Sequence, residues 1–175
     1  MTSHVPVFMA LGSNVEPETN LRRAVHLLAE RLPIRAVSRV YRTVALDANG
    51  QPLPDHPPFL NAALLGETTL PPAALKFDVL RPLEARLGRS RSGHDRIIHP
   101  IDLDLVLYGD LVLDDPASGL RLPDPDILTR AYMALPLADL APDFIHPVTG
   151  QTLAEIAAAF AGQPDITISP LILSG

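Results

Sequence analysis

The sequence lacks cysteine and tryptophan and contains a single lysine, Lys76. Without cysteine, the chain has no disulfide, no iron–sulfur cluster, no thiolate zinc site and no thiol nucleophile. No apolar run approaches the ~20 residues needed to cross a bilayer, so we expect no membrane partner. The first residues show no basic segment followed by an apolar one, so we predict no secretory signal and a cytoplasmic protein.

Common nucleotide-binding and catalytic signatures are also missing. The sequence has neither the G-x-x-x-x-G-K-[ST] phosphate loop nor the G-x-G-x-x-G dinucleotide fingerprint. It lacks the kinase catalytic-loop signature, a G-x-S-x-G serine and the H-x-x-x-H pair of a zinc site. A formal charge of −6 argues against nucleic acid as a partner. Any ATP chemistry must therefore use less common motifs.

Apolar periodicity and turn residues predict a folded chain with one domain spanning 1–175. We expect strands at 5–11, 34–41, 59–68 and 101–108, and helices at 17–32, 71–87 and 153–160. Pro82 should kink or break the second helix. The order β-α-β-β-α-β with a C-terminal extension is typical of a ferredoxin-like α+β fold, an antiparallel sheet with helices on one face. The state of the apolar tail, 166–173, is left open.

Two aspartates in the last predicted strand carry the strongest chemical signal. Alternate side chains of a strand share a face, so Asp102 and Asp104 point the same way. Two carboxylates ~7 Å apart on one face repel each other unless water or a cation separates them. Oxygen ligands of this kind suit Mg²⁺, which is held by one or two carboxylates plus substrate phosphates. The alternative is a solvated outer face of an edge strand.

Basic residues gather just before this strand. Five arginines fall within 16 residues, namely Arg81, Arg86, Arg89, Arg91 and Arg96. Arginine grips phosphate oxygens in a planar fork, so a mobile loop that carries several could close over a polyphosphate. A solvated basic loop is the alternative. Glu84, three residues after Arg81, has either a functional role or a simple ion pair with that arginine.

One polar side chain interrupts the apolar strand predicted at 59–68. Asn61 must satisfy both donors and an acceptor if it is buried. A heterocycle with alternating donors and acceptors would do so, and neighbouring backbone is the alternative. Phe59, two residues earlier on the same face, could stack against such a ring.

Taken together, the motifs resemble the 6-hydroxymethyl-7,8-dihydropterin pyrophosphokinase family of folate biosynthesis. The resemblance covers roughly residues 7–156. It rests on Leu11-Gly12-Ser13-Asn14, Tyr41-Arg42-Thr43, Phe59-Leu60-Asn61-Ala62-Ala63, Leu83-Glu84, Gly88-Arg89, Asp102-Leu103-Asp104-Leu105, Tyr108-Gly109 and Pro136-Leu137.

The resemblance implies that a monomer transfers pyrophosphate from ATP to 6-hydroxymethyl-7,8-dihydropterin and releases AMP. It implies two Mg²⁺ ions on Asp102 and Asp104, with catalytic roles also for Arg89, Arg91 and His99. The residues implied to bind ATP are Glu84, Arg89, Arg91, Leu105, Arg121 and Arg130. Those implied to bind the pterin are Thr43, Leu46, Phe59, Asn61 and Tyr132.

The chain departs from the family pattern near the expected phosphate site. Arg96 stands where the family has an aromatic residue, and His99 stands where it has an arginine. Asp124 and Pro125 replace a histidine, which contacts ATP, and a tyrosine. One lost donor to developing phosphate charge can cost about 3 kcal/mol, which a protonated His99 would partly offset.

These departures leave other functions open. A paralogue could act on a different pterin, or the chain could be a non-catalytic pterin-binding or nucleotide-binding module. The retained pair of aspartates argues against a pure binding module. A regulatory ferredoxin-like domain that dimerises through its sheet would leave those aspartates without a metal or a cleft.

Overall fold

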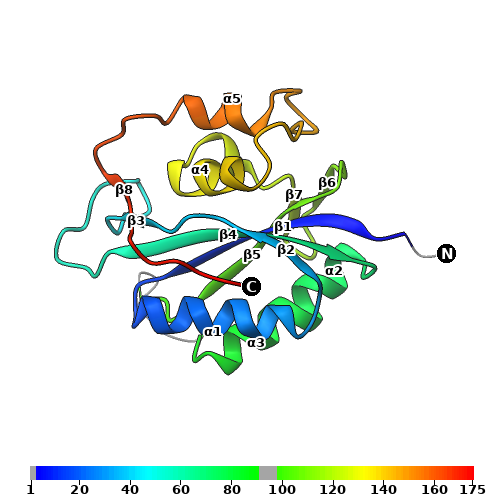
Figure 1. The fold of residues 1–175 in the computed structure, drawn as a ribbon, viewed down its shortest axis with the longest axis horizontal. Coiled ribbons are helices and arrows are strands. Elements are labelled where there is room, and N and C mark those ends of the chain that lie inside the picture. Colours follow the sequence, from blue (N-terminus) through cyan, green and yellow to red (C-terminus); the bar gives the residue numbers. More distant parts are fainter. Residues whose placement is uncertain (1–2, 91–97) are drawn as a thin grey trace.

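A six-stranded antiparallel sheet forms the centre of the computed structural model, which describes residues 3–90 and 98–175 (Figure 1). The strands lie in the order β5–β1–β4–β3–β8, and β2 pairs with the remaining length of β4. Their bounds are β1 Val5–Ser13, β2 Ile34–Val37, β3 Tyr41–Thr43, β4 Phe59–Thr68, β5 Asp102–Tyr108 and β8 Ile166–Ile168. A separate hairpin joins β6 Leu113–Asp115 to β7 Leu120–Leu122.

The helices lie on both faces of the sheet (Figure 1). Their bounds are α1 Pro17–Ala29, α2 Pro72–Ala74, α3 Arg81–Arg86, α4 Ala131–Leu140 and α5 Leu153–Ala158. Two other helical segments are the π-helix η1 Leu75–Leu80 and the 3₁₀ helix η2 Pro125–Leu128. The order β1-α1-β2/β3-β4-α2/α3-β5 confirms the expected ferredoxin-like arrangement. The helices α1, α2 and α3 cover one face, as predicted, and the C-terminal extension supplies α4 and α5 on the other.

The second predicted strand was too long. The structure divides 34–41 into two strands, β2 and β3. Between them, Ser38 bonds to Ala63 of β4 with its side chain as well as its backbone. The Ser38 amide donates to the Ala63 carbonyl at 3.0 Å, and the Ser38 hydroxyl accepts from the Ala63 amide at 2.8 Å. The side chain thus takes the place of a backbone carbonyl and redirects the chain.

Pro82 distorts its helix without ending it. Proline lacks an amide hydrogen and crowds the preceding turn. The turns before it widen into η1, and the Arg81 amide donates to the Lys76 carbonyl, five residues back. The helix then continues as α3, in which Glu84 lies against β5 and accepts a hydrogen bond from the Leu103 amide.

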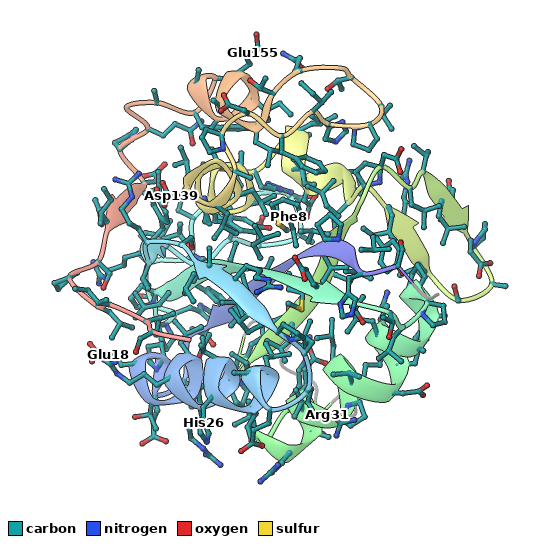
Figure 2. All side chains as sticks on the ribbon, turned by 45° about the vertical axis from the view of Figure 1, so that its right-hand side comes forward. Phe8, Glu18, His26, Arg31, Asp139 and Glu155 are labelled. Atoms are coloured by element: carbon teal, nitrogen blue, oxygen red, sulfur yellow. The ribbon has the colours of Figure 1, made fainter. Side chains whose placement is uncertain are left out.

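Each face of the sheet has its own apolar core. Alternate side chains of β1 and β5, such as Leu11 and Leu103, belong to the core formed with α1 and α3. On the opposite face, Phe8 lies between the sheet and α4 (Figure 2), and its ring meets Phe144 edge-on at 4.9 Å. The tail that the sequence left open forms β8, which pairs with β3. Within 3–90 and 98–175, no helix has the length and apolarity to cross a membrane.

The packing of α4 predicts that Leu137→Ala will destabilise the protein strongly. Leu137 is fully buried in the core with Phe8. Truncation of a buried leucine costs about 2–5 kcal/mol, because it loses apolar burial and leaves a cavity. Ile172→Ala, at a side chain that is 79% exposed, should change stability by less than about 0.5 kcal/mol. Urea denaturation measures both, and equal stabilities would contradict the assigned core.

Candidate functional site

The site is built on one row of residues that crosses the sheet. Asp102 of β5 pairs with Gly12 of β1, which pairs with Asn61 of β4, which pairs with Tyr41 of β3. Directly opposed residues of antiparallel strands point to the same face. The next row places Asp104 opposite Ala10. Both aspartates and Asn61 therefore project from the face that α4 covers.

A pocket of about 250 Å³ lies over these rows. Gly12 and Ala10 form its floor, and their small size leaves open the space between the aspartates and Asn61. A β-carbon at Gly12 would lie only 3.2 Å from Asn61 Oδ1. The other residues that line the pocket are Leu11, Thr43, Val44, Leu46, Asp47, Phe59, Asn61, His99, Asp102, Asp104, Arg130, Tyr132 and Met133.

Negative charge is concentrated at one end of the pocket. Burial, followed by the charges of Asp102, Asp124 and Glu84, raises the pKa of Asp104 to about 7. Burial also raises the pKa of Glu84, which is almost wholly inaccessible to solvent. Such a group of carboxylates favours the approach of a cation.

Arg89 supplies positive charge to this group. Its Nη1 lies 2.6 Å from Asp102 Oδ1 and 3.9 Å from Glu84 Oε1, and it donates to the Ile101 carbonyl at 3.1 Å. Glu84 Oε1 accepts from the Leu103 amide at 2.8 Å, which ties α3 to β5. Arg89 is thus a brace behind Asp102.

The ion pair between Arg81 and Glu84, one of the two alternatives for Glu84, does not form among the residues that the structure describes, and both side chains make other contacts. The Arg81 guanidinium lies over the Phe77 ring, 4.7 Å from its centroid. Glu84 instead points inward to β5 and Arg89. The functional interpretation of Glu84 therefore rests on its support of the aspartate strand.

Polar and aromatic groups occupy the other end of the pocket. The Asn61 amide nitrogen donates to Thr43 Oγ1 at 2.9 Å and to the Tyr41 carbonyl at 3.4 Å. This arrangement fixes the orientation of the amide. Phe59 lies on the same face, and its ring centroid is 5.9 Å from that of His99, with the planes tilted by 43°. The backbone of His99 is held by two hydrogen bonds with Asn14.

The wall above Asn61 comes from the start of α4. Arg130 precedes the helix, and Tyr132 and Met133 lie in its first turn. Burial raises the pKa of Tyr132 to about 12, so its hydroxyl stays protonated at neutral pH. The aromatic ring and the arginine thus close the pocket from the side opposite the sheet.

The structure brings together most of the residues expected at the site. Nine of them line the pocket: Thr43, Leu46, Phe59, Asn61, His99, Asp102, Asp104, Arg130 and Tyr132. Arg89 and Glu84 stand behind Asp102 rather than in the lining. Leu105 is buried in the core with α1 and α3, and Arg121 is exposed beside Asp114. Arg91 and Arg96 lie outside the described residues.

Six residues that line the pocket were not expected from the sequence, and two of them are the small floor residues Gly12 and Ala10. The others are Leu11, Val44, Asp47 and Met133. Small residues carry no chemical signal by themselves. Their role follows from the register of β1 between β4 and β5, which local periodicity does not reveal.

The aspartates offer the hard oxygen ligands that Mg²⁺ prefers. They alone do not complete a coordination shell, since the described part of the chain holds no cluster of three or more metal-binding side chains. An ion here would take further oxygens from water or a bound phosphate. The crowded carboxylates and the open pocket beside them fit that requirement.

Comparison with known proteins bears directly on this site. The family model for 7,8-dihydro-6-hydroxymethylpterin-pyrophosphokinase (HPPK) matches residues 8–142, which include the sheet residues and the α4 wall. The chain belongs to the HPPK family. The family resemblance predicted from the motifs is therefore confirmed.

Curated relatives support this membership over most of the chain. The 2-amino-4-hydroxy-6-hydroxymethyldihydropteridine pyrophosphokinase of Pseudomonas aeruginosa is 38% identical over 159 residues, covering 87% of this chain and 90% of the relative. The Aquifex aeolicus protein of the same name is 30% identical, with 94% of each chain covered. The folic acid synthesis protein fol1 of Pneumocystis carinii is 31% identical, and the match spans 95% of this chain but only 21% of that longer protein.

Solved structures share the HPPK fold. The HPPK-DHPS triple mutant of Plasmodium falciparum with SDX-DHP superposes with a TM-score of 0.72 at 14% identity. The match covers 95% of this chain and 45% of that one. This HPPK chain therefore spans less than half of the two-part Plasmodium protein.

The brace formed by Arg89 predicts a stability effect. Arg89→Ala should cost about 3 kcal/mol, because it removes the cation that lies 2.6 Å from the Asp102 carboxylate and 3.9 Å from the buried Glu84 carboxylate. Added MgCl₂ should raise the melting temperature of this variant more than that of the unaltered protein, since a cation can replace the lost charge.

The matched control is Arg121→Ala, which removes an exposed pair with Asp114 at 3.8 Å. Its effect should stay within about 0.5 kcal/mol. Thermal denaturation with and without MgCl₂ measures both variants. An Arg89→Ala protein as stable as the control would rule out the brace.

Proposed function

We propose that this chain transfers pyrophosphate from ATP to the hydroxymethyl oxygen of 6-hydroxymethyl-7,8-dihydropterin in the pocket over β1, β4 and β5. The observation that carries the proposal is that a single pocket has a carboxylate end and an end with an amide and aromatic rings. One end holds Asp102 and Asp104, and the other holds Asn61, Phe59 and Tyr132. A pterin with a polyphosphate beside it has the same division into a flat heterocycle and an anionic tail.

The pterin ring would bind at the end of the pocket that contains Asn61. The Asn61 amide nitrogen already donates to Thr43 Oγ1, and Oδ1 lies beside Gly12, so the amide has a fixed direction. A pterin ring offers alternating donors and acceptors to such a group. Phe59 and Tyr132 supply aromatic surface against which a planar ring can pack.

The phosphates of ATP would bind at the end of the pocket that contains the aspartates. Asp102 and Asp104 would hold Mg²⁺, which, when bound, neutralises phosphate charge and polarises the phosphorus–oxygen bonds. Arg130 reaches the pocket from α4, and Arg89 keeps Asp102 in place. These residues restrict how the polyphosphate can lie.

The reaction is a displacement at the β-phosphorus. The hydroxymethyl oxygen forms the new bond to phosphorus, the bond to the α-phosphate oxygen breaks, and AMP leaves with that oxygen. The hydroxyl proton is released in the same exchange. Phosphoryl transfer of this kind depends on alignment and charge neutralisation, with no covalent intermediate on the protein.

A second candidate, action on a different pterin, is favoured by His99. Its ring lies beside Phe59 at the edge of the pocket, where the family resemblance led us to expect an arginine. Asp124 also adds negative charge near Asp104 where a histidine was expected. A comparison of kcat/KM for 6-hydroxymethyl-7,8-dihydropterin and a series of substituted hydroxymethylpterins would show which pterin is the preferred substrate.

The proposal treats residues 1–175 as one pterin pyrophosphokinase domain that works as a cytoplasmic monomer. Sedimentation at assay concentration tests this point.

Replacement of both aspartates should abolish turnover. Asp102→Asn/Asp104→Asn keeps the side-chain shape but removes the charges expected to hold the metal, so AMP formation should fall by on the order of 10³-fold or more. Chelation of Mg²⁺ should stop AMP formation by the unaltered protein, and added MgCl₂ should restore it. Asp110→Asn, in the exposed turn after β5, is the matched control. Coupled AMP detection with equal rates for both variants would refute the proposed function.

Gly12→Ala should weaken pterin binding selectively. The added methyl would lie 3.2 Å from Asn61 Oδ1 and 3.9 Å from Phe59 Cδ1, on the floor where the heterocycle is expected. The KM for the pterin should rise about tenfold, equivalent to a loss of about 1.4 kcal/mol, with the KM for ATP nearly unchanged. Initial-rate kinetics with each substrate varied measures both. An unaltered KM for the pterin would place the heterocycle elsewhere.

A further inference from the structure

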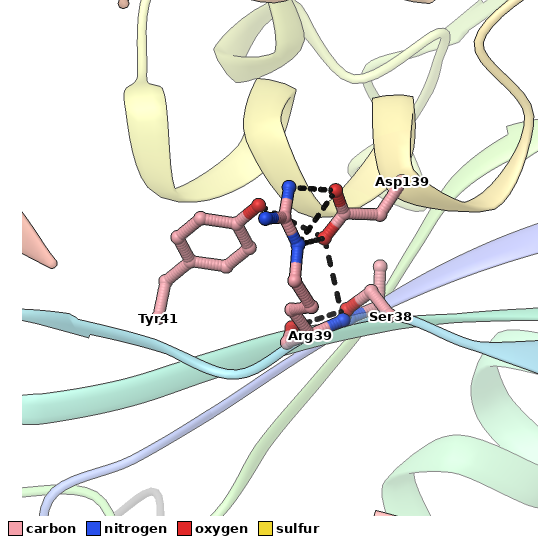
Figure 3. A network of polar contacts seen from close by, with 5 residues as sticks. Ser38, Arg39, Tyr41 and Asp139 are labelled. Atoms are coloured by element: carbon pink, nitrogen blue, oxygen red, sulfur yellow. Dashed lines mark hydrogen bonds and ion pairs between the residues drawn. The ribbon is translucent and has the colours of Figure 1, made fainter. Parts of the chain in front are cut away.

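A polar network outside the pocket joins α4 to the chain between β2 and β3 (Figure 3). Asp139, near the end of α4, accepts from the Arg39 guanidinium at 2.6, 3.1 and 3.2 Å and from the Arg39 amide at 3.3 Å. It also accepts from the Tyr41 hydroxyl at 2.9 Å. One carboxylate thus binds both a side chain and the backbone of the sheet segment.

The Asp139 side chain is only 14% exposed, whereas that of Arg39 is 58% exposed. A shielded carboxylate is held more firmly than a pair on open surface, because solvent screens it less. The Arg39 guanidinium also lies 5.6 Å from the centroid of the Tyr41 ring. Burial and Asp139 raise the pKa of Tyr41 to about 12, which keeps its hydroxyl a donor at neutral pH.

The helix needs such an anchor because Pro136 lies inside it. Proline has no amide hydrogen, so the carbonyl four residues earlier, that of Tyr132, loses its helical partner. Tyr132, Pro136 and Asp139 are spaced by four and three residues and therefore lie on one face. The pocket-lining turn and the anchor are thus the two ends of a helix whose internal ladder is interrupted between them.

The other side of the network leads to Asn61. Tyr41 pairs with Asn61 across β3 and β4, and its carbonyl accepts from the Asn61 amide nitrogen at 3.4 Å. Ser38, beside Arg39, is fixed to β4 through Ala63. Asp139 therefore grips the segment that orients Asn61, while its own helix carries Tyr132 on the opposite side of the pocket.

We propose that Asp139 is a positioning residue for the pterin: it sets the separation between the Tyr132 wall and Asn61 by fixing α4 to Arg39 and Tyr41. The inference rests on the proposed function, because the pterin is the ligand expected between these two groups. Asp139 lines no part of the pocket and acts only through other residues. The effect of its loss is thus a change in pterin binding with little change in ATP binding.

Steady-state kinetics of Asp139→Asn tests the inference. The variant keeps the side-chain shape and removes the charge that holds Arg39. The KM for the pterin should rise about tenfold, whereas kcat and the KM for ATP should stay within about twofold. Asp139→Glu, which restores the charge, should recover part of the affinity. Calorimetry of hydroxymethylpterin binding measures the same loss without turnover.

Arg35→Ala is the matched control. It removes another arginine–carboxylate pair of the same sheet, with Glu67 at 2.8 Å, whose side chains do not line the pocket. This variant should keep the KM of the unaltered protein. Arg39→Ala breaks the network from its exposed partner and replaces Asp139→Asn in the test if that variant fails to fold.

The outcomes separate this inference from the proposed function. If Asp139→Asn and Arg39→Ala bind the pterin as tightly as Arg35→Ala does, the positioning role is wrong and the pyrophosphokinase activity stands. A lower melting temperature with unchanged KM values would make the network purely structural and also overturn the inference. If the unaltered protein neither binds the pterin nor forms AMP, the proposed function fails first.

Discussion

The crowding of carboxylates at the start of β5 is the constraint on which the site depends. Asp102 and Asp104 share a face because strand side chains alternate, and Glu84 approaches from the helix below. Burial and the neighbouring carboxylates raise the pKa of Asp104 to about 7, so its charged form is favoured only when positive charge lies nearby. Arg89 meets part of that need within the fold. A cation brought with a phosphate ligand would meet the rest.

Local patterns in the sequence were sufficient to predict β1, β4 and β5 and the helices that cover one face of the sheet. The strand 59–68 matches β4 residue for residue, because its apolar run is long and bounded by turn residues. The break between β2 and β3 was missed because it arises from a tertiary contact of Ser38 with Ala63. The placement of α4 and α5 on the second face was likewise beyond periodicity, which shows that a helix is amphipathic but not which face of the sheet it covers.

The site was predictable where residue type alone carries chemistry. Asp102, Asp104 and Asn61 are polar residues in apolar strands, so each required an explanation. Gly12 and Ala10 required none, yet their register between β4 and β5 leaves the space for a ligand. The contact of Arg89 with Asp102 was equally hidden, because it depends on where the chain after α3 returns to the sheet.

The floor and the upper wall of the pocket therefore differ in how firmly they are held. Its floor is a set of paired strands, where a shift of one residue would turn every side chain to the other face, so the distance from Asp102 to Asn61 is fixed by register. Its upper wall is a helix interrupted by Pro136, whose position depends on side-chain anchors such as Asp139. Adjustment to a different heterocycle would thus occur in α4 and its anchors. The carboxylates on the sheet would keep their place for the phosphates.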